Sequence, residues 1–404
     1  MGSSHPLPPD ALDLPRLASL PAGLAPAAPA RRVHLSPPHL TGAEMTAIGA
    51  SLASGWLAPA GPVPAAFEAA IAEATGFPHV VAVTSGTAAL HLAYRCLDVG
   101  AGDEVWTSTL TYVATIAPAV QLGARPRFLD VDPRSWTLDP ALLRRALAAA
   151  ARRGALPRAV VPVDLYGQAS DLPAIVAACE RWGVPVVSDS AEGLGALQHG
   201  LPAGRGARLA TYSFNGNKIV TAGGGGALAS ADPLPVRRAR HLATQAKEPV
   251  PHYQHETTGY SYGLSSVLAA VGLAQLAALE ARVAARRAVF ARYVAGLCDL
   301  PGLAFMPEAP WGHATRWLSV IVIEPARFGA DREAVRRALD AAGIESRPVW
   351  KPMHLQPVFA DAPCEGGGVA QQLFETGLCL PSGSALGPED QDRVVAIIRG
   401  CCGA

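Results

Sequence analysis

Short apolar runs alternate with alanine-rich segments of helical periodicity over residues 79–230. The runs have the length and apolar character of buried strands, at residues 79–85, 103–108, 125–131, 158–164, 184–190, 209–214 and 226–230. Helical patterns lie between most of them, for example at 87–97, 140–153 and 172–182. Strands that alternate with helices predict an α/β fold whose large, mostly parallel sheet is covered on both faces. Ligands bind beyond the carboxyl ends of the strands in such sheets, so residues that follow strands are the candidates for chemistry.

The chain before the first predicted strand has two different patterns. Residues 1–32 are rich in alanine and proline and predict a flexible tail, in which prolines interrupt any apolar run of the signal-peptide type. Thr41 and Glu44 have the spacing of a capping box, which predicts a helix that begins there and runs to about residue 54.

A long helical pattern at 265–297 follows the last strand of the predicted large sheet. Beyond about residue 300 the pattern predicts a smaller α/β domain, with a strand at 317–323 and helices at 331–342 and 388–399. We therefore expect a large domain over 33–285, including the N-terminal helical segment, and a small C-terminal domain over 286–404.

Composition narrows the class of partner. Apolar residues make up 50% of the chain and charged residues 16%, which indicates a globular protein. Lysine plus arginine and aspartate plus glutamate number 33 each, without a basic block, so the charge pattern does not indicate nucleic acid or a membrane surface as a partner. The chain contains no apolar run of transmembrane length. We expect a small-molecule partner.

The seven cysteines are scattered along the chain and form no C-x-x-C pair. Their odd number and spacing argue against a disulfide framework or a zinc site and favour a reducing cytoplasm. We expect no bound metal.

The first candidate for chemistry is VTSGTAAL at 83–90, where a predicted strand turns directly into a helix. Gly86 permits a tight turn, and the free N–H groups at the start of the helix, next to Thr87, would suit a phosphate. An ordinary capped helix after a strand explains this motif equally well when it is considered alone.

The second candidate is Asp189, which follows the apolar strand at 184–190 and is followed by Glu192. A carboxylate at a strand end either caps the next segment or faces a cationic group of a buried ligand.

The third candidate is Lys218 in SFNGNKIVTAGGGG at 213–226, which begins with Ser213. The chain contains only three lysines, at 218, 247 and 351, and arginine supplies the other basic side chains. An amine can lose its proton and attack a carbonyl, whereas a guanidinium cannot. A phosphate-binding P-loop is excluded because isoleucine and valine follow Lys218 in place of serine or threonine. The alternative is a solvated surface lysine.

Together these candidates suggest pyridoxal 5′-phosphate as a cofactor. This cofactor needs a phosphate site, an acid beside its pyridine nitrogen and a lysine that forms a Schiff base with its aldehyde. Each part is a weak signal alone, and the ordered set is considerably stronger.

At this level of detail the chain resembles the DegT/StrS family of nucleotide-sugar aminotransferases, which are fold-type I enzymes that use pyridoxal phosphate. The resemblance covers roughly residues 34–400. It rests on VTSGTAALHLA, TLTYVAT, PVDLYGQ, DSAEGLGA, YSFNGNKIVTAGGGGA, LAAVGLAQL, RPVWKPMHLQPVF and GLCLPSGSAL. The segments are most similar to members that aminate C4 of UDP-linked 4-keto-6-deoxy sugars in bacillosamine-type, legionaminic-type or exopolysaccharide pathways.

The resemblance implies a role for each matching residue. It implies that Lys218 forms the Schiff base and that Asp189 pairs with the pyridine nitrogen. The remaining cofactor-binding positions would be Gly86, Thr87 and Ser213 at the phosphate, Tyr112 stacked on the ring and Glu192 near its 3′-oxygen. The WKPMH segment lies near the substrate in this family, which makes Trp350, Lys351 and His354 substrate candidates.

The family is dimeric, and each active site is completed by the neighbouring subunit. The family usually has GYNYR where this chain has GYSYG at 259–263, so Ser261 would take the place of an asparagine that reaches the neighbour's cofactor phosphate. Gly263 replaces an arginine. The departure leaves the cross-subunit phosphate contact and the substrate open.

GYSYG also matches G-x-S-x-G, the nucleophile elbow of α/β-hydrolases. That motif must follow an apolar strand, and the polar segment HYQHETT precedes it here, which argues against a hydrolase. His252 and His255 in the same segment have helical spacing but no accompanying carboxylate pattern for a metal.

We therefore expect an aminotransferase that moves an amino group from an amino acid, with glutamate as the expected donor, to a nucleotide-linked keto sugar at C4. A dehydratase of the same family would carry histidine in place of Lys218, which argues against that branch. Two alternatives stay open at this point. The protein could aminate a non-sugar cyclic ketone in secondary metabolism, or it could bind the cofactor in a catalytically altered form.

Overall fold

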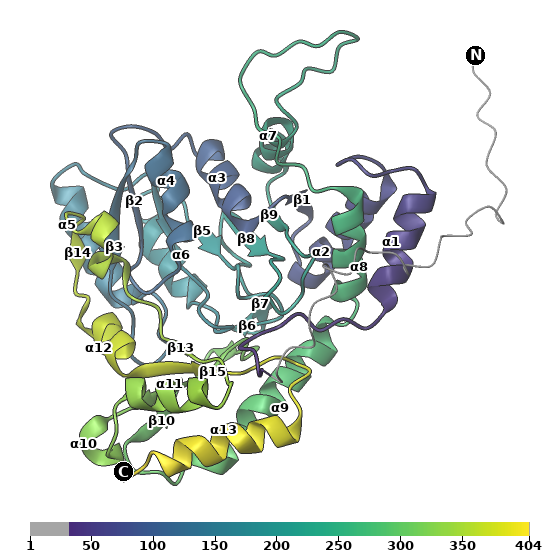
Figure 1. The fold of residues 1–404 in the computed structure, drawn as a ribbon. Helices are drawn as coiled ribbons and strands as arrows, with labels where there is room; N and C mark the ends of the chain where they lie inside the picture. Colours follow the sequence, from purple (N-terminus) through teal and green to yellow (C-terminus); the bar gives the residue numbers. More distant parts are fainter. Residues whose placement is uncertain (1–31, 404) are drawn as a thin grey trace. The chain divides into compact units, whose positions relative to one another are not determined.

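The computed structural model describes residues 32–403, so the tail predicted at 1–32 lies outside the described residues apart from Arg32. Figure 1 shows a large sheet with helices on both faces and a smaller sheet built from the C-terminal third of the chain.

The large sheet consists of two four-stranded ladders joined by bridges. Its strands lie in the order β1 (His79–Val83), β9 (Gly226–Ser230), β8 (Leu209–Ser213), β5 (Val187–Asp189), β4 (Ala159–Val161), β2 (Glu104–Ser108), β3 (Arg125–Leu129) and β14 (Cys364–Glu365). Parallel bridges between Val160 and Val186 and between Val163 and Asp189 join the two ladders. Within the described residues, only β9 runs antiparallel to its neighbours in this sheet. The predicted mostly parallel α/β sheet is confirmed, and most predicted strands are shorter in the structure at one or both ends.

Alternate side chains of the strands pack into cores on opposite faces of the large sheet. In β1, Val81 and Val83 belong to a core under α3 (Gly86–Cys96), α4 (Ala117–Gln121) and α7 (Pro233–Ala243). Val80 and Ala82 face the other side, where α2 (Pro62–Thr75) and α8 (Ser266–Leu276) lie. Further along that side, α5 (Pro140–Arg152) and α6 (Leu172–Glu180) cover a third core. Because side chains alternate in a strand, a parallel sheet buried on both faces needs apolar residues at nearly every position.

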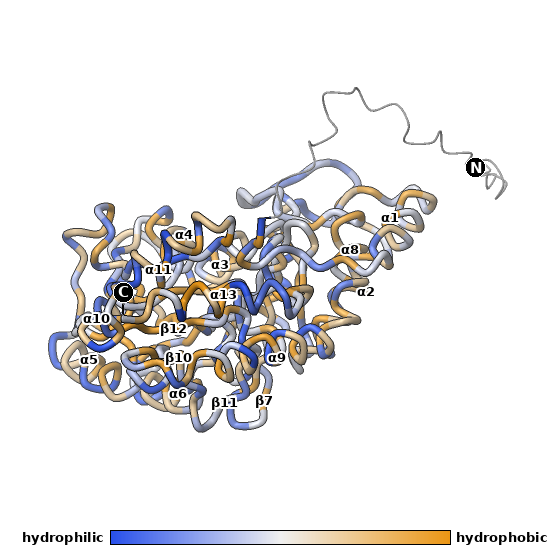
Figure 2. The backbone as a smooth tube through the Cα atoms, turned by 60° about the horizontal axis from the view of Figure 1, so that its bottom comes forward, coloured by the Kyte–Doolittle hydropathy of each residue, from blue (hydrophilic) through white to orange (hydrophobic). Residues whose placement is uncertain are grey.

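The smaller sheet is antiparallel and has its own core. Its strands lie in the order β10 (Leu303–Phe305), β12 (Ser319–Ile323), β15 (Gly377–Leu380) and β13 (Arg347–Pro348). Helices α9 (Leu279–Leu297), α11 (Arg332–Ala341) and α13 (Pro388–Gly400) contribute side chains to the same core. Figure 2 shows the hydrophobic positions of β12 beside the mixed pattern of α13. The predicted boundary at 285/286 falls inside α9 and stays a prediction.

The remaining elements connect these layers. They are α1 (Ala43–Ala53), α10 (Pro325–Phe328), α12 (Gly368–Thr376), the strands β6 (Leu197–Gln198), β7 (Leu201–Pro202) and β11 (Gly312–His313), and three 3₁₀ turns at Val113–Thr115, Met353–Leu355 and Pro357–Phe359. The predicted capping box is present in part: the Glu44 carboxylate accepts hydrogen bonds from the N–H groups of Thr41 and Gly42.

The long helix predicted at 265–297 is wrong in one respect. The segment forms two helices, α8 and α9, which meet at an angle of 61°. The helices pack in different layers, which explains the bend: α8 lies against α1 and α2, whereas α9 lies against α13 and buries Tyr293 and Leu297 in the core of the small sheet. No single described helix has the length and apolar content to cross a membrane, and α8 with α9 reaches that threshold only as a bent pair.

Candidate active site

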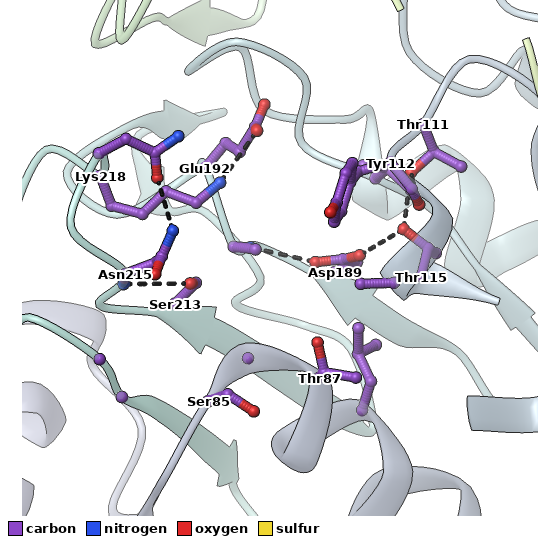
Figure 3. A pocket seen from close by; sticks show the side chains of 18 of the residues that line it. Ser85, Thr87, Thr111, Tyr112, Thr115, Asp189, Glu192, Ser213, Asn215 and Lys218 are labelled. Atoms are coloured by element: carbon purple, nitrogen blue, oxygen red, sulfur yellow. Dashed lines mark hydrogen bonds and ion pairs between the residues drawn. The ribbon is translucent and has the colours of Figure 1, made fainter. Parts of the chain in front are cut away.

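A cavity of about 340 Å³ opens at the carboxyl ends of the parallel strands. It lies where β1, β5 and β8 end and where the chain turns into the next segments (Figure 3). The candidate residues that line it are Gly86, Thr87, Tyr112, Asp189, Glu192, Ser213, Lys218 and Trp350. The structure therefore brings eight of the predicted site residues to one place.

The turn from β1 into α3 forms one wall of the cavity. The Ser85 hydroxyl accepts a hydrogen bond of 3.0 Å from the N–H of Ala88, which caps the helix. The N–H groups of Gly86 and Thr87 precede the first bond within the helix, so they are available to a ligand. A Cβ atom added at Gly86 would lie 3.0 Å from the Cβ of Ser213, which shows how closely the helix approaches the end of β8.

Asp189 is buried at the end of β5 and takes part in a short chain of hydroxyl groups. Its Oδ2 accepts a hydrogen bond of 2.7 Å from Thr115 Oγ1, and its Oδ1 accepts one of 3.2 Å from the N–H of Ala191. The hydroxyl of Thr111 lies 2.6 Å from that of Thr115. Thr115 has one hydroxyl proton and gives it to the carboxylate, so Thr111 is the donor in the second bond. Burial raises the pKa of Asp189, and the hydrogen bonds and the charge of Lys218 oppose this rise.

Lys218 forms a buried ion pair at the opposite wall. Its Nζ lies 3.0 Å from Glu192 Oε1, and the side chain is only 14% exposed. The alternative of a solvated surface lysine is therefore wrong. The other oxygen of Glu192 accepts a hydrogen bond of 2.8 Å from the N–H of Tyr166. Burial raises the pKa of Glu192 to about 7, although the charge of Lys218 acts in the opposite direction.

The PVDLYGQ segment makes a tight hairpin turn that supports Glu192. Leu165 and Gln168 exchange backbone hydrogen bonds of 2.9 and 2.8 Å. The two residues between them, Tyr166 and Gly167, have φ angles of +52° and +92°. Such a turn needs positive φ at both central positions, which favours glycine at the second. The Tyr166 hydroxyl accepts a hydrogen bond of 3.0 Å from the N–H of Trp350, so this turn also fixes the segment that reaches the cavity from the C-terminal part.

Aromatic side chains lie at the mouth of the cavity. Tyr112 is 59% exposed, and its ring centroid lies 5.8 Å from that of Trp350. Figure 3 shows the Tyr112 ring beside Asp189.

Three predicted residues do not line the cavity of their own chain: Ser261, Lys351 and His354. Ser261 is exposed and pairs through its backbone with Thr244, which is not the strand-turn-helix setting of a nucleophile elbow. His354 Nδ1 lies 2.6 Å from the hydroxyl of Thr109. Lys351 is half-buried and lies outside the cavity wall.

Sequence reasoning missed several residues that hold this site together. Thr115 and Thr111 belong to the TLTYVAT segment, but no motif or spacing marks them as partners of Asp189. Trp317 lies under Lys218 with its ring centroid 4.3 Å from Nζ, and it comes from a part of the chain about a hundred residues away. The only sequence signal for Thr111 and Thr115 as site residues was their position shortly after the end of β2.

Comparison with known proteins identifies the class. Residues 38–399 match the DegT/DnrJ/EryC1/StrS aminotransferase family, and the chain belongs to this family. It is therefore an aminotransferase with the α/β fold of these enzymes, as the sequence predicted.

Individual relatives match over nearly their full lengths. The chain is 44% identical over 372 residues to EpsN of Bacillus subtilis (strain 168), which is named as a pyridoxal phosphate-dependent aminotransferase; the match covers 91% of this chain and 95% of EpsN. It is 34% identical to the GDP-perosamine synthase of Caulobacter vibrioides (strain ATCC 19089 / CIP 103742 / CB 15), over 91% and 97% of the two chains. The crystal structure of DesI, determined in the presence of its TDP-sugar product, superposes with a TM-score of 0.84 at 28% identity, over 94% and 95% of the two chains.

The family and the named relative imply pyridoxal phosphate, and the cavity fits this group. A buried carboxylate, a shielded amine and the start of a helix face one space. These are the acid, the amine and the anion site that the cofactor requires. The close approach of Gly86 to Ser213 would bring a hydroxyl and helix N–H groups to the same phosphate.

Proposed function

We propose that the protein transfers an amino group from glutamate to C4 of a nucleotide-linked keto sugar, with pyridoxal 5′-phosphate bound in the cavity. The observation that carries the proposal is the arrangement of Lys218 and buried Asp189 around one cavity at the strand ends. When bound, the cofactor supplies an aldehyde that accepts the amino group and a ring that takes up an electron pair.

In this proposal Lys218 has two tasks. Its Nζ would hold the cofactor at the aldehyde group, and its free amine would take the proton from the donor's α-carbon. A side chain that is 14% exposed keeps this amine away from bulk water. Glu192 lies within hydrogen-bond distance of Nζ, which supports a role in orienting the amine and in contacting the ring's 3′-oxygen.

Asp189 would hold a proton at the pyridine nitrogen. The Thr111–Thr115 hydroxyl chain fixes one carboxylate oxygen, and the N–H of Ala191 contacts the other. A carboxylate held in this way cannot rotate freely, and its negative charge favours the protonated nitrogen.

The phosphate would lie at the start of α3. Gly86 and Thr87 would offer N–H groups, and Ser213 a hydroxyl. Tyr112 would cover the ring from the open side of the cavity.

We further propose a homodimer with shared active sites, in which Ser261 reaches the partner's cofactor phosphate. Figure 1 shows a long loop between α7 and α8 that extends away from the large sheet, and Ser261 lies in the last part of this loop. Large apolar side chains are exposed on and near α1, at Leu40, Met45, Leu52, Trp56 and Leu57, which supports burial against another chain. A Cβ atom added at Gly263 would lie 2.7 Å from the Cβ of Pro59, so the family's arginine would require this loop to move.

The nucleotide-sugar substrate is supported by the relatives that are named for such chemistry, one a GDP-perosamine synthase and one bound to a TDP-sugar product. Trp350 lines the cavity and would contact the sugar, whereas the proposal for Lys351 and His354 rests on the family resemblance alone. The seven cysteines are free in the structure, which supports our expectation of a cytoplasmic enzyme.

A panel of UDP-, dTDP- and GDP-linked 4-keto and 3-keto sugars tests the proposal. Each sugar is incubated with glutamate and the holoenzyme, and the product is identified by mass. We expect amination of a 4-keto sugar and none with Lys218→Ala. Turnover of no sugar in the panel, or equal turnover by the alanine variant, would contradict the proposal.

A further inference from the structure

Lys218 contacts a second side chain that the proposed mechanism does not use. Its Nζ lies 4.3 Å from the ring centroid of Trp317 and 3.0 Å from Glu192 Oε1. Trp317 is 3% exposed and lies two residues before the start of β12 in the small sheet. Trp317 is not among the residues that line the cavity, whereas Lys218 is. An indole face attracts an ammonium group, and the attraction is stronger where water is excluded.

The indole holds the backbone in front of Lys218 as well as the amine at its end. Trp317 Nε1–H donates a hydrogen bond of 2.8 Å to the carbonyl oxygen of Asn217. Asn217 directly precedes Lys218 in the chain. One side chain therefore contacts both the amine of Lys218 and the backbone next to it.

Trp317 is itself held from three directions. Its carbonyl oxygen accepts a hydrogen bond of 2.5 Å from Arg286 Nη1. Its ring is stacked on Tyr166, with centroids 6.4 Å apart and planes inclined by 28°. Its indole N–H is bound to Asn217. Arg286 of α9 thus holds the backbone of Trp317, while Tyr166 and the carbonyl oxygen of Asn217 orient its ring.

Arg286 extends this network to the start of the described chain. It is 2% exposed, and its Nη2 donates a hydrogen bond of 3.1 Å to the hydroxyl of Ser36. That hydroxyl donates in turn to the carbonyl oxygen of Asn217, at 2.7 Å. Among the described residues Arg286 makes no ion pair with a carboxylate, and the hydrogen bonds found for it go to carbonyl and hydroxyl oxygens. Through Ser36 and Trp317, which both donate to the carbonyl oxygen of Asn217, this buried guanidinium stabilises the loop that carries Lys218.

We propose that Trp317 is a positioning residue for Lys218. Its ring holds the free amine of Lys218 against Glu192 whenever the lysine is not bonded to the cofactor. The inference rests on the proposed function, in which the amine is released and must return in each cycle. A long flexible side chain would otherwise sample many positions, and the indole face limits it to one. The alternative is that Trp317 only fills the core.

Competitive acetylation of the cofactor-free protein tests this inference. The chain contains three lysines, so Lys247 and Lys351 serve as internal references for Lys218. Trace acetic anhydride labels uncharged, accessible amines, and mass spectrometry of the peptides gives the three extents. In Trp317→Leu we expect labelling of Lys218 to rise about three- to tenfold relative to the references, because the ring no longer covers the amine and holds it against Glu192. Trp317→Phe retains an aromatic face and should stay within about twofold of the wild type.

Trp106→Leu is the matched control. Trp106 is 1% exposed in β2 and packs in a different core, so its loss should reduce stability without changing the labelling of Lys218. An unchanged labelling ratio in folded Trp317→Leu would overturn the inference. If that variant does not fold, wild-type protein with ¹³C-labelled lysine gives the answer: the ε-CH₂ signal of Lys218 should be shifted upfield of that of Lys351, and equal positions would overturn the inference.

A further sample separates the two proposals. Pyridoxal 5′-phosphate added to the wild type should protect Lys218 from acetylation and leave Lys247 and Lys351 unprotected. Failure of this protection contradicts the proposed function. Protection without an effect of Trp317→Leu contradicts only the role of Trp317.

Discussion

Replacement of Asp130 tests how the C-terminal segment that brings Trp350 to the cavity is held on the large sheet. Asp130 follows β3 and is buried. Its carboxylate accepts four backbone hydrogen bonds: 2.9 Å from Val131, 2.7 Å from Gly367, 3.0 Å from Val369 and 3.0 Å from Ala370. Three of these donors are at the start of α12, for which no side chain within the helix segment acts as cap. Asp130, directly after β3 of the large sheet, therefore caps α12 of the C-terminal part.

The number of donors sets the expected loss in the free energy of unfolding. Asp130→Ala leaves four N–H groups without their acceptor, and a buried donor left unpaired costs roughly 1–3 kcal/mol. Water entry and local relaxation recover part of this cost, so we expect a loss of about 3–5 kcal/mol in the free energy of unfolding. Asp130→Asn retains one acceptor oxygen but lacks the negative charge at the helix start, so we expect about half of that loss.

Urea unfolding of the cofactor-free variants, followed by circular dichroism, measures the change as a shift in midpoint at unchanged m-value. Asp139→Ala is the control, because Asp139 caps α5 within its own segment through hydrogen bonds from Ala141 and Leu142. An ordinary cap of this kind is worth about 1 kcal/mol. A loss in Asp130→Ala no larger than that in Asp139→Ala would refute the reasoning.

Three further predictions concern the site. The folded-state pKa of Glu192, about 7, lies above its ordinary value of 4.5, so this group contributes stability that is full below pH 4.5 and is lost as the pH rises through 7. Glu192→Gln should remove this part of the pH dependence of unfolding in cofactor-free protein, and identical slopes for the two proteins would contradict the shift. Thermal unfolding should show that Gly167→Ala lowers the free energy of unfolding by more than about 2 kcal/mol, because the added Cβ would lie 2.2 Å from a threonine hydroxyl oxygen and φ at this position is +92°. Gly154→Ala is the control: its φ is +64° and the space around it is open, so we expect a loss of about 1 kcal/mol in the same assay. Thr115→Val should weaken binding of pyridoxal phosphate about tenfold, because it loses the hydrogen bond to Asp189. Thr115→Ser keeps the hydroxyl and should bind the cofactor as the wild type does. Equal dissociation constants for all three proteins in a fluorescence titration would contradict this role of Thr115.

The position of the site could be predicted because it follows from the topology. Asp189 and Ser213 end strands, Gly86 and Lys218 follow strands, and carboxyl ends of parallel strands meet at one edge of a sheet. The structure places all four on one cavity, and their roles stay proposals.

The supporting contacts could not be predicted in this way. Thr115 and Asp189 are separated by 74 positions, and Trp317 and Asn217 by 100, so their contacts depend on how whole layers pack. The break between α8 and α9 has the same cause. Helical periodicity continues through Ala277 and Ala278, and only the orientation of two cores requires the 61° bend.

The most direct test of the account is to locate the cofactor on the chain. Purified protein incubated with pyridoxal 5′-phosphate should be yellow, and reduction with borohydride should fix a pyridoxyl group on the peptide that contains Lys218. No label should appear at Lys247 or Lys351, and Lys218→Ala should carry none. A colourless protein, or a label fixed at either of the other lysines, would contradict the central claim that Lys218 and Asp189 form a pyridoxal phosphate site.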